Sequence, residues 1–98
     1  ATLYFRPRVE RDLDRLAMFL AETMPLEAAK TFQLIDDALL LLERHPEIGR
    51  PTEDGLRELM ISRGRTGYVA LYWFDEIRDE VVVLAVRHQC EAGFGDAL

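Results

Sequence analysis

Hydrophobic side chains recur at helical spacing in the first half of the chain. They stand at steps of four, three, four and four, at Val9, Leu13, Leu16, Leu20 and Met24. Such a stripe is typical of one face of an amphipathic helix. The charged residues of this segment then fall on its other faces: Arg8, Arg11, Asp12 and Arg15. A weak strand over 2–5 precedes the helix, and Pro7 ends that strand or opens the helix.

A second helix follows at once. The sequence Thr23-Met24-Pro25 interrupts the first pattern, so the next helix is expected to begin near Leu26. Its apolar face carries Ala28, Phe32, Ile35, Leu39 and Leu42, and is widened by Leu40 and Leu41. His45-Pro46 ends it, because proline disfavours the helical conformation of the preceding residue. So short a connection predicts an antiparallel helical hairpin, and residues 46–55 are expected to be a loop.

The second half of the chain changes to the period of strands. Leu59 and Ile61 alternate with polar residues, and two apolar runs, 68–74 and 81–86, follow after turns at 64–67 and 75–80. The expected order is strand–helix–helix–strand–strand–strand. The two helices must bury their apolar faces on a sheet. We therefore predict one α+β domain over residues 1–98, a helical hairpin packed on a small, mostly antiparallel curved sheet.

Composition narrows the functional classes. The net charge is −6 and the isoelectric point is about 4.8, which argues against nonspecific nucleic-acid binding through phosphates. No apolar run approaches the roughly 20 residues of a membrane helix, and residues 1–5 lack the features of a signal peptide. The single cysteine, Cys90, excludes an internal disulfide, and no Cys/His cluster has metal-site spacing. We expect a soluble, cytoplasmic protein without metal or cofactor and without direct nucleic-acid or membrane binding.

The only basic cluster is formed by Arg57, Arg63 and Arg65. On one strand Arg57 shares a face with Leu59 and Ile61. It is therefore either an arginine at the rim of the core, paired to a carboxylate, or a partner contact. Arg63 and Arg65 lie near a turn, where exposure and contact with a partner are favoured.

Aromatic and polar residues of the last two strands are further candidates. Tyr68, Tyr72 and Phe74 alternate on one face and are expected in the core, with a stacking platform for bases as the alternative. Trp73 points the other way, where it is either covered by the tail or exposed as an interface anchor. Arg87 either pairs with an acid inside the fold or faces a partner. His88 is either held by backbone where the strand ends or serves as a polar contact or vestigial catalytic group at the sheet edge. No nucleophile or acid nearby completes a catalytic set.

Five short phrases, in order along the chain, resemble the RelE/ParE superfamily of toxins. They are Asp12-Leu13 with a leucine three residues on, 45–50 (HPEIGR), 56–59 (LREL), 66–72 (TGYVALY) and 83–89 (VLAVRHQ). The resemblance implies a toxin of a type II toxin–antitoxin system. It also implies that the helical hairpin and the sheet edge bind the antitoxin, which would share part of the hairpin's apolar surface.

The superfamily contains two activities. RelE-like members cleave messenger RNA on the ribosome, which requires a base, an acid and cations around the phosphate. At the positions where they carry basic residues or tyrosine, this chain has Met60, Ser62, Val69, Gln89 and either Phe94 or Gly95, with Arg63 as a partial substitute.

The resemblance therefore favours the ParE-like branch, whose members act in plasmid stabilisation, inhibit DNA gyrase without catalysis and are neutralised by a ParD-type antitoxin. The expected partner-binding residues are Arg57, Arg63, Arg65, Trp73, Arg87 and His88. The alternative is a RelE-like ribonuclease with a remodelled site drawn from Arg57, Arg63, Tyr72, Arg87 and His88. A third possibility is a toxin that has lost its target and binds only the antitoxin.

Overall fold

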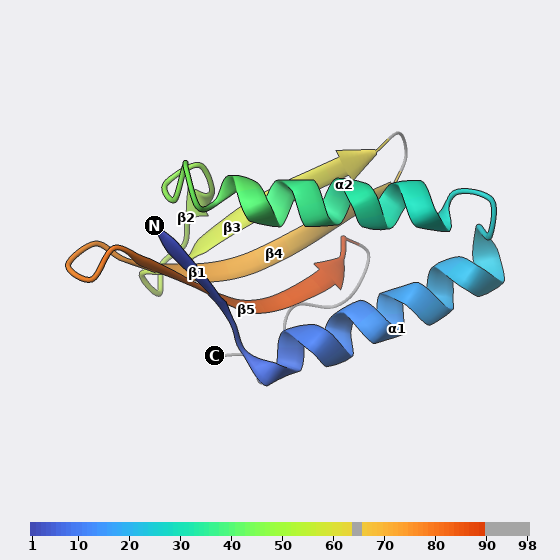
Figure 1. The fold of residues 1–98 in the computed structure, drawn as a ribbon, viewed down its shortest axis with the longest axis horizontal. Helices are drawn as coiled ribbons and strands as arrows, with labels where there is room; N and C mark the ends of the chain where they lie inside the picture. Colours follow the sequence, from blue (N-terminus) through green and yellow to red (C-terminus); the bar gives the residue numbers. More distant parts are fainter. Residues whose placement is uncertain (64–65, 90–98) are drawn as a thin grey trace.

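The computed structural model describes residues 1–63 and 66–89 of the chain (Figure 1). Its elements, in order, are β1 (Thr2–Phe5), α1 (Pro7–Thr23), α2 (Ala28–Leu41), β2 (Arg50–Pro51), β3 (Arg57–Arg63), β4 (Thr66–Asp75) and β5 (Glu80–His88). The expected α+β order is confirmed, with β2 added inside the segment that we expected to be a loop. No helix in the described part of the chain is long and apolar enough to cross a bilayer.

The second helix begins two residues later than expected. Residues 25–27 form a turn, in which the Glu27 N–H donates to the Met24 carbonyl oxygen at 3.0 Å. Leu26 is almost fully exposed there and has no place in the buried stripe. The apolar face of α2 therefore starts at Ala28, and the helix ends at Leu41.

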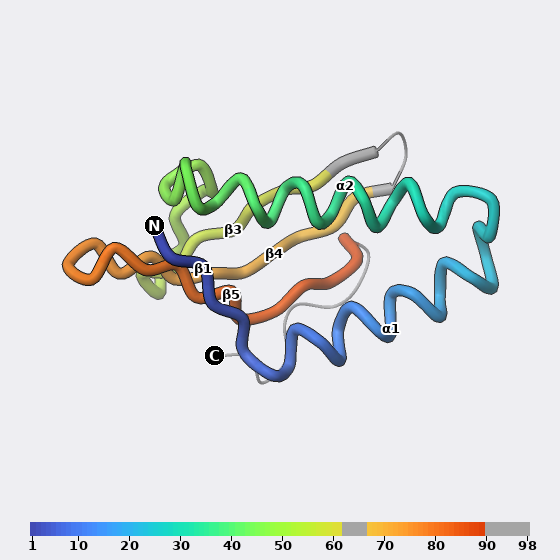
Figure 2. Tube along the Cα trace, in the orientation of Figure 1, coloured from blue at the N-terminus to red at the C-terminus, as the bar shows by residue number. Residues whose placement is uncertain are grey.

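The sheet has the strand order β1-β5-β4-β3-β2. All neighbours are antiparallel except β1 and β5, which run parallel with Thr2 opposite Glu80 and Phe5 opposite Val83. Both helices stand on one face of this sheet, α1 along β5 and α2 along β3 (Figures 1 and 2). They meet at their connection and diverge toward the end where β1 lies (Figure 2).

The core lies between the helices and the sheet. From the helical hairpin it takes Val9, Leu16, Ile35, Leu39 and the residue after α2, Leu42. From the strands it takes Leu59, Ile61, Tyr68, Ala70, Tyr72, Val81, Val83 and Val86. Tyr68 and Tyr72 are fully buried and Phe74 packs beside them, as the alternation in β4 predicts. A β-bulge places Leu71 opposite Ala85 but Tyr72 opposite Val83. The extra residue in β5 lets Val86 face the helices again.

Asp12 corrects the helical pattern. We expected it on an outer face of α1, but it is buried, with 3% of its surface exposed. One carboxylate oxygen accepts the Val86 N–H at 3.0 Å, and the guanidinium groups of Arg8 and Arg15 lie 3.4 and 3.6 Å away. Because β1 pairs with β5 only as far as Val83, the backbone beyond it needs another partner. The carboxylate supplies that partner and anchors α1 to the sheet.

Candidate partner-binding surfaces

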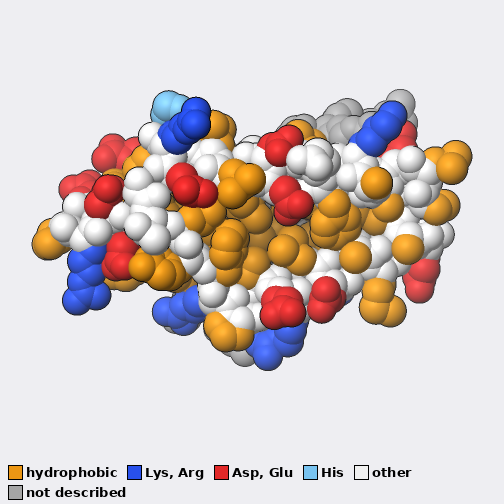
Figure 3. All heavy atoms as spheres, in the orientation of Figure 1, with side chains coloured by type: hydrophobic (Ala, Val, Ile, Leu, Met, Phe, Trp, Pro, Cys, Tyr) orange, Lys and Arg blue, Asp and Glu red, His pale blue; other side chains and the backbone are white. Residues whose placement is uncertain are grey.

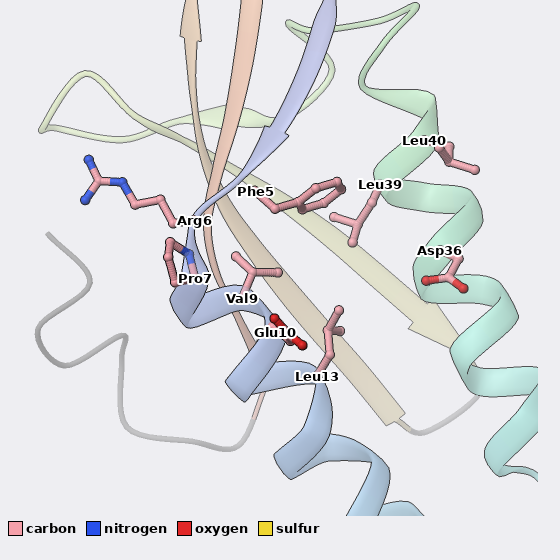
Figure 4. Close-up of a pocket in the computed structure, with 9 residues that line it drawn as sticks. All are labelled: Phe5, Arg6, Pro7, Val9, Glu10, Leu13, Asp36, Leu39 and Leu40. Carbon is pink, nitrogen blue, oxygen red and sulfur yellow. The ribbon is translucent and has the colours of Figure 1, made fainter.

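A groove runs between α1 and α2 and deepens where the helices diverge. Figure 3 shows a continuous band of apolar side chains along this face. Near β1 the groove holds a cavity of about 600 Å³, whose apolar walls are Phe5, Pro7, Val9, Leu13, Leu39 and Leu40 (Figure 4). Phe5 and Leu40 are 49% and 56% exposed. An apolar cavity with half-exposed walls is typical of a surface that another chain covers.

Two carboxylates stand at this cavity. Glu10 comes from α1 and Asp36 from α2, and Figure 4 shows Asp36 projecting toward α1, with Glu10 on the facing helix. Both residues are exposed, and within residues 1–63 and 66–89 neither side chain makes an ion pair or a hydrogen bond. The Arg6 guanidinium extends away from the cavity (Figure 4). The charge that faces the apolar walls is therefore negative.

The loop before β2 is held by the hydroxyl group of Tyr72. The Gly49 N–H donates to the tyrosine oxygen at 2.8 Å, and the tyrosine O–H donates to the Pro46 carbonyl oxygen at 2.8 Å. A Cβ atom on residue 49 would lie 2.6 Å from that oxygen. Only glycine allows so close an approach. The phrase 45–50 is thus explained by packing against β4.

Arg57 holds the same loop from β3. Its guanidinium donates to the carbonyl oxygens of Glu47 and Gly49, at 3.0 and 2.8 Å. The expected position at the rim of the core is confirmed, but these hydrogen-bond acceptors are carbonyl oxygens and not a carboxylate. Backbone carbonyl oxygens can accept from the guanidinium because the loop folds back over the start of β3, where Pro51 pairs with Arg57. Whether Arg57 also contacts a partner stays a prediction.

The Tyr72 phenol makes the free energy of unfolding fall as the pH rises in the alkaline range. Burial raises its pKa above the ordinary value, although the Gly49 N–H and the Arg57 charge lower it in part. A folded-state pKa above the unfolded value of about 10 gives stability that is complete below pH 10 and is lost as the pH rises through the folded pKa.

Tyr72→Phe should cost about 1–2 kcal/mol at neutral pH. Urea unfolding between about pH 8 and pH 11 should show this difference shrinking as pH rises; parallel pH profiles would contradict it.

One predicted contact residue, Trp73, lies on the sheet face opposite the helices. Trp73 follows the inward-facing Tyr72 and is 44% exposed. It stands opposite Val82, beside a small apolar cluster centred on Leu71 and Leu84. Met60, on β3, is equally exposed. The outward orientation expected for Trp73 is confirmed, and its neighbour Val82 packs against that buried cluster.

The other two candidates, Arg87 and His88, lie at the end of β5 on opposite faces of the sheet. Arg87 donates to the backbone oxygens of His88 and Gln89, both at 3.2 Å. Along the strand it alternates with Val86, which faces the helices, and it therefore shares the Trp73 face. The His88 ring instead lies on the helix side, where its centre is 5.3 Å from that of Tyr68 and 6.0 Å from that of Phe19. The predicted contacts thus occupy both faces of the sheet.

Some predictions fall outside the described residues. Arg65, Cys90, Phe94 and Gly95 belong to the segments 64–65 and 90–98, and the Arg63 side chain is likewise not described. Within the described part, no group of three His, Cys, Asp or Glu side chains could hold a metal ion.

Sequence reasoning missed the two carboxylates of the groove. Each directly follows a buried residue of its helix, Glu10 after Val9 and Asp36 after Ile35. One step along a helix turns about 100° away from the buried stripe, and this places both acids at its border. Acidic residues at the border of two facing stripes are a signal that the sequence already contains.

Comparisons with known proteins agree with this architecture. The family described as ParE toxin of type II toxin-antitoxin system, parDE, matches residues 3–93. Toxin RelE3 of Caulobacter vibrioides is 35% identical over 85 residues, which cover 87% of this chain and 90% of the relative. Toxin RelE1 of the same organism is 35% identical over 71 residues, 72% of this chain and 76% of the relative.

Two solved structures share the fold. A chain of the chromosomal ParDE system from P. aeruginosa superposes with a TM-score of 0.72 at 23% identity, covering 89% of this chain and 94% of that one. A chain of the RelBE2 toxin–antitoxin complex from Mycobacterium tuberculosis superposes with a TM-score of 0.57 at 28% identity, covering 90% and 96%. From the family match and the curated relatives, the chain belongs to the ParE toxin family of the RelE/ParE superfamily and is the toxin of a type II toxin–antitoxin system.

Proposed function

We propose that this toxin acts in the cytoplasm by binding DNA gyrase and not by cleaving RNA. The observation that carries the proposal is Val69. It directly follows Tyr68, at the position where RelE-like nucleases carry an arginine. Its side chain is 1% exposed in the sheet and offers neither charge nor proton. RNA cleavage needs cations around the phosphate and a positioned acid and base. Met60, at a position of an expected lysine, supplies none of these.

His88 supports the same conclusion. Its ring packs edge-on against Tyr68 and lies near Phe19. This aromatic contact accounts for a histidine at the end of β5 without a catalytic role. The relatives named RelE keep the ribonuclease as the competing hypothesis, and the assay below includes it.

A gyrase supercoiling reaction tests the proposal. Purified toxin should abolish supercoiling at about stoichiometric concentration and trap cleaved DNA, and the cognate antitoxin should reverse both effects. Folded toxin that leaves gyrase unaffected but cleaves messenger RNA on translating ribosomes would contradict the proposal. Folded toxin inactive in both reactions would also contradict it and favour a chain that binds only its antitoxin.

The same assay locates the target contact. We expect Trp73 and Arg87, on the sheet face opposite the helices, to contact gyrase together with Arg63 and Arg65. Trp73→Ala should raise the toxin concentration for half-inhibition about tenfold or more, because a buried aromatic anchor often contributes 2 kcal/mol or more. Ile77→Ala is the matched control, since Ile77 is an apolar side chain 97% exposed in the turn after β4.

We further propose that a segment of a ParD-type antitoxin occupies the groove between α1 and α2. Half-exposed Phe5 and Leu40 and the cavity of about 600 Å³ between the helices support this placement. An apolar face of a partner would remove these walls from water.

A further inference from the structure

We propose that the groove selects an amphipathic helix of the antitoxin with basic residues on both flanks of its apolar stripe. In this arrangement the stripe fills the cavity, while lysine or arginine side chains pair with Glu10 on one rim and Asp36 on the other. The inference rests on the proposed docking of the antitoxin in the groove. It adds the chemistry by which the groove distinguishes one antitoxin segment from another.

The shape of the groove favours a helix. Its walls are two helices, α1 and α2, that diverge and leave an apolar floor between them (Figures 2 and 3). A helix laid in such a groove buries side chains at positions i, i+3, i+4 and i+7 and places polar residues at both rims. An extended segment would instead pair with a strand edge, here that of β1, and would leave the cavity between the two helices unfilled.

The charge of the rims decides which helix fits. Glu10 and Asp36 stand on opposite helices, and neither is neutralised by an ion pair among the described residues. A docked helix removes water from both carboxylates, which is unfavourable unless a cation replaces that water. A helix with neutral or acidic flanks would carry this penalty, or a repulsion, at both rims. A helix with basic flanks gains two ion pairs next to apolar surface, so the rims discriminate by charge.

The side chains of lysine and arginine suit the site for a second reason. Their aliphatic stems lie along apolar surface while the charged head reaches the rim. Leu13 lies near Glu10, and Leu39 and Leu40 follow Asp36 in the lining of the cavity. A basic flank can therefore contact the apolar wall and the carboxylate at once.

The test compares two doubly neutralised toxins. In Glu10→Gln with Asp36→Asn the rims lose their charge, whereas in Glu22→Gln with Asp37→Asn the same helices lose equal charge at exposed residues outside the cavity lining. Binding of the purified cognate antitoxin is measured at low and high salt. The rim variant should bind about tenfold to a hundredfold more weakly at low salt, with a shallower salt dependence, and the control variant should match the wild type.

A third variant separates this inference from the docking proposal. Leu40→Asp changes an exposed wall of the cavity and should weaken antitoxin binding about tenfold or more if the groove is the site. Weaker binding by Leu40→Asp together with unchanged binding by the rim variant would overturn the charge selection and leave the docking intact. Unchanged binding by both variants, with thermal unfolding like that of the wild type, would overturn the docking and with it the inference.

Discussion

Replacing Asp12 with alanine should lower the free energy of unfolding by about 3 kcal/mol. The substitution leaves the Val86 N–H buried with no acceptor and takes the carboxylate away from Arg8 and Arg15. A domain of this size is stable by about 5–15 kcal/mol, so the loss is a large fraction of the total. Urea unfolding followed by circular dichroism should show a lower midpoint with an unchanged slope.

Two variants separate the causes of that loss. Asp12→Asn keeps an oxygen for the Val86 N–H but removes the charge, and it should cost about 1 kcal/mol. Asp14→Ala removes an exposed acid from the same helix and should change stability by less than about 0.5 kcal/mol. If Asp12→Ala proved no worse than Asp14→Ala, the carboxylate would not anchor α1 to β5.

Asp12 also shows where prediction from a helical stripe fails. The stripe from Val9 to Leu20 was correct and both helices were found, because spacing alone determines which face turns inward. We placed Asp12 on the outer face because a charged side chain, considered by itself, favours water. Its burial is favoured by an N–H of β5, 74 residues away, that has no strand beside it. No pattern in the sequence around Asp12 indicates that a distant backbone N–H lacks an acceptor.

The strands divide in the same way. Strands β3, β4 and β5 were predicted because each is long enough to show alternation or a β-branched run. Strand β2 has two residues, one of them Pro51, and exists only because the loop lies against β3. Its pairing follows from tertiary contacts and leaves no periodic signal in the sequence.

The sequence predicted which single residues of the candidate surfaces are exposed, but not which of them lie together. The outward direction of Trp73 followed from alternation with Tyr72. An apolar surface on the helical hairpin was implied only by the resemblance to the toxin superfamily. Gathering the predicted arginines into one patch depends on which sheet face each occupies. Arg57 turns to the helix side and its loop, whereas Arg87 shares the face of Trp73. The sequence contains the position of Glu10 and Asp36 at the borders of the two stripes, but their place beside an open cavity depends on how far apart the helices stand.

The contact between Gly49 and Tyr72 sets the other large effect. Gly49→Ala should cost about 3 kcal/mol, at the upper end of the usual penalty for overpacking. The new Cβ atom would lie 2.6 and 2.7 Å from two ring-end atoms of Tyr72 and 3.0 Å from the Glu58 carbonyl oxygen. Tyr72 cannot yield, because it is fully buried in a central strand. The loop must move instead, which breaks the hydrogen bonds to its backbone. Thermal or urea unfolding measures the loss.

Gly55 provides the matched control for that substitution. It has φ +80° and no atom within 4 Å of an added Cβ. Gly55→Ala should therefore cost only the backbone strain, about 1–2 kcal/mol. Combining Gly49→Ala with Tyr72→Phe removes one of the clashing atoms, so the double variant should lose less stability than the sum of the single losses. Strict additivity, or equal costs at the two glycines, would contradict a steric role for residue 49. Packing of the loop against Tyr72 would then not account for glycine at position 49.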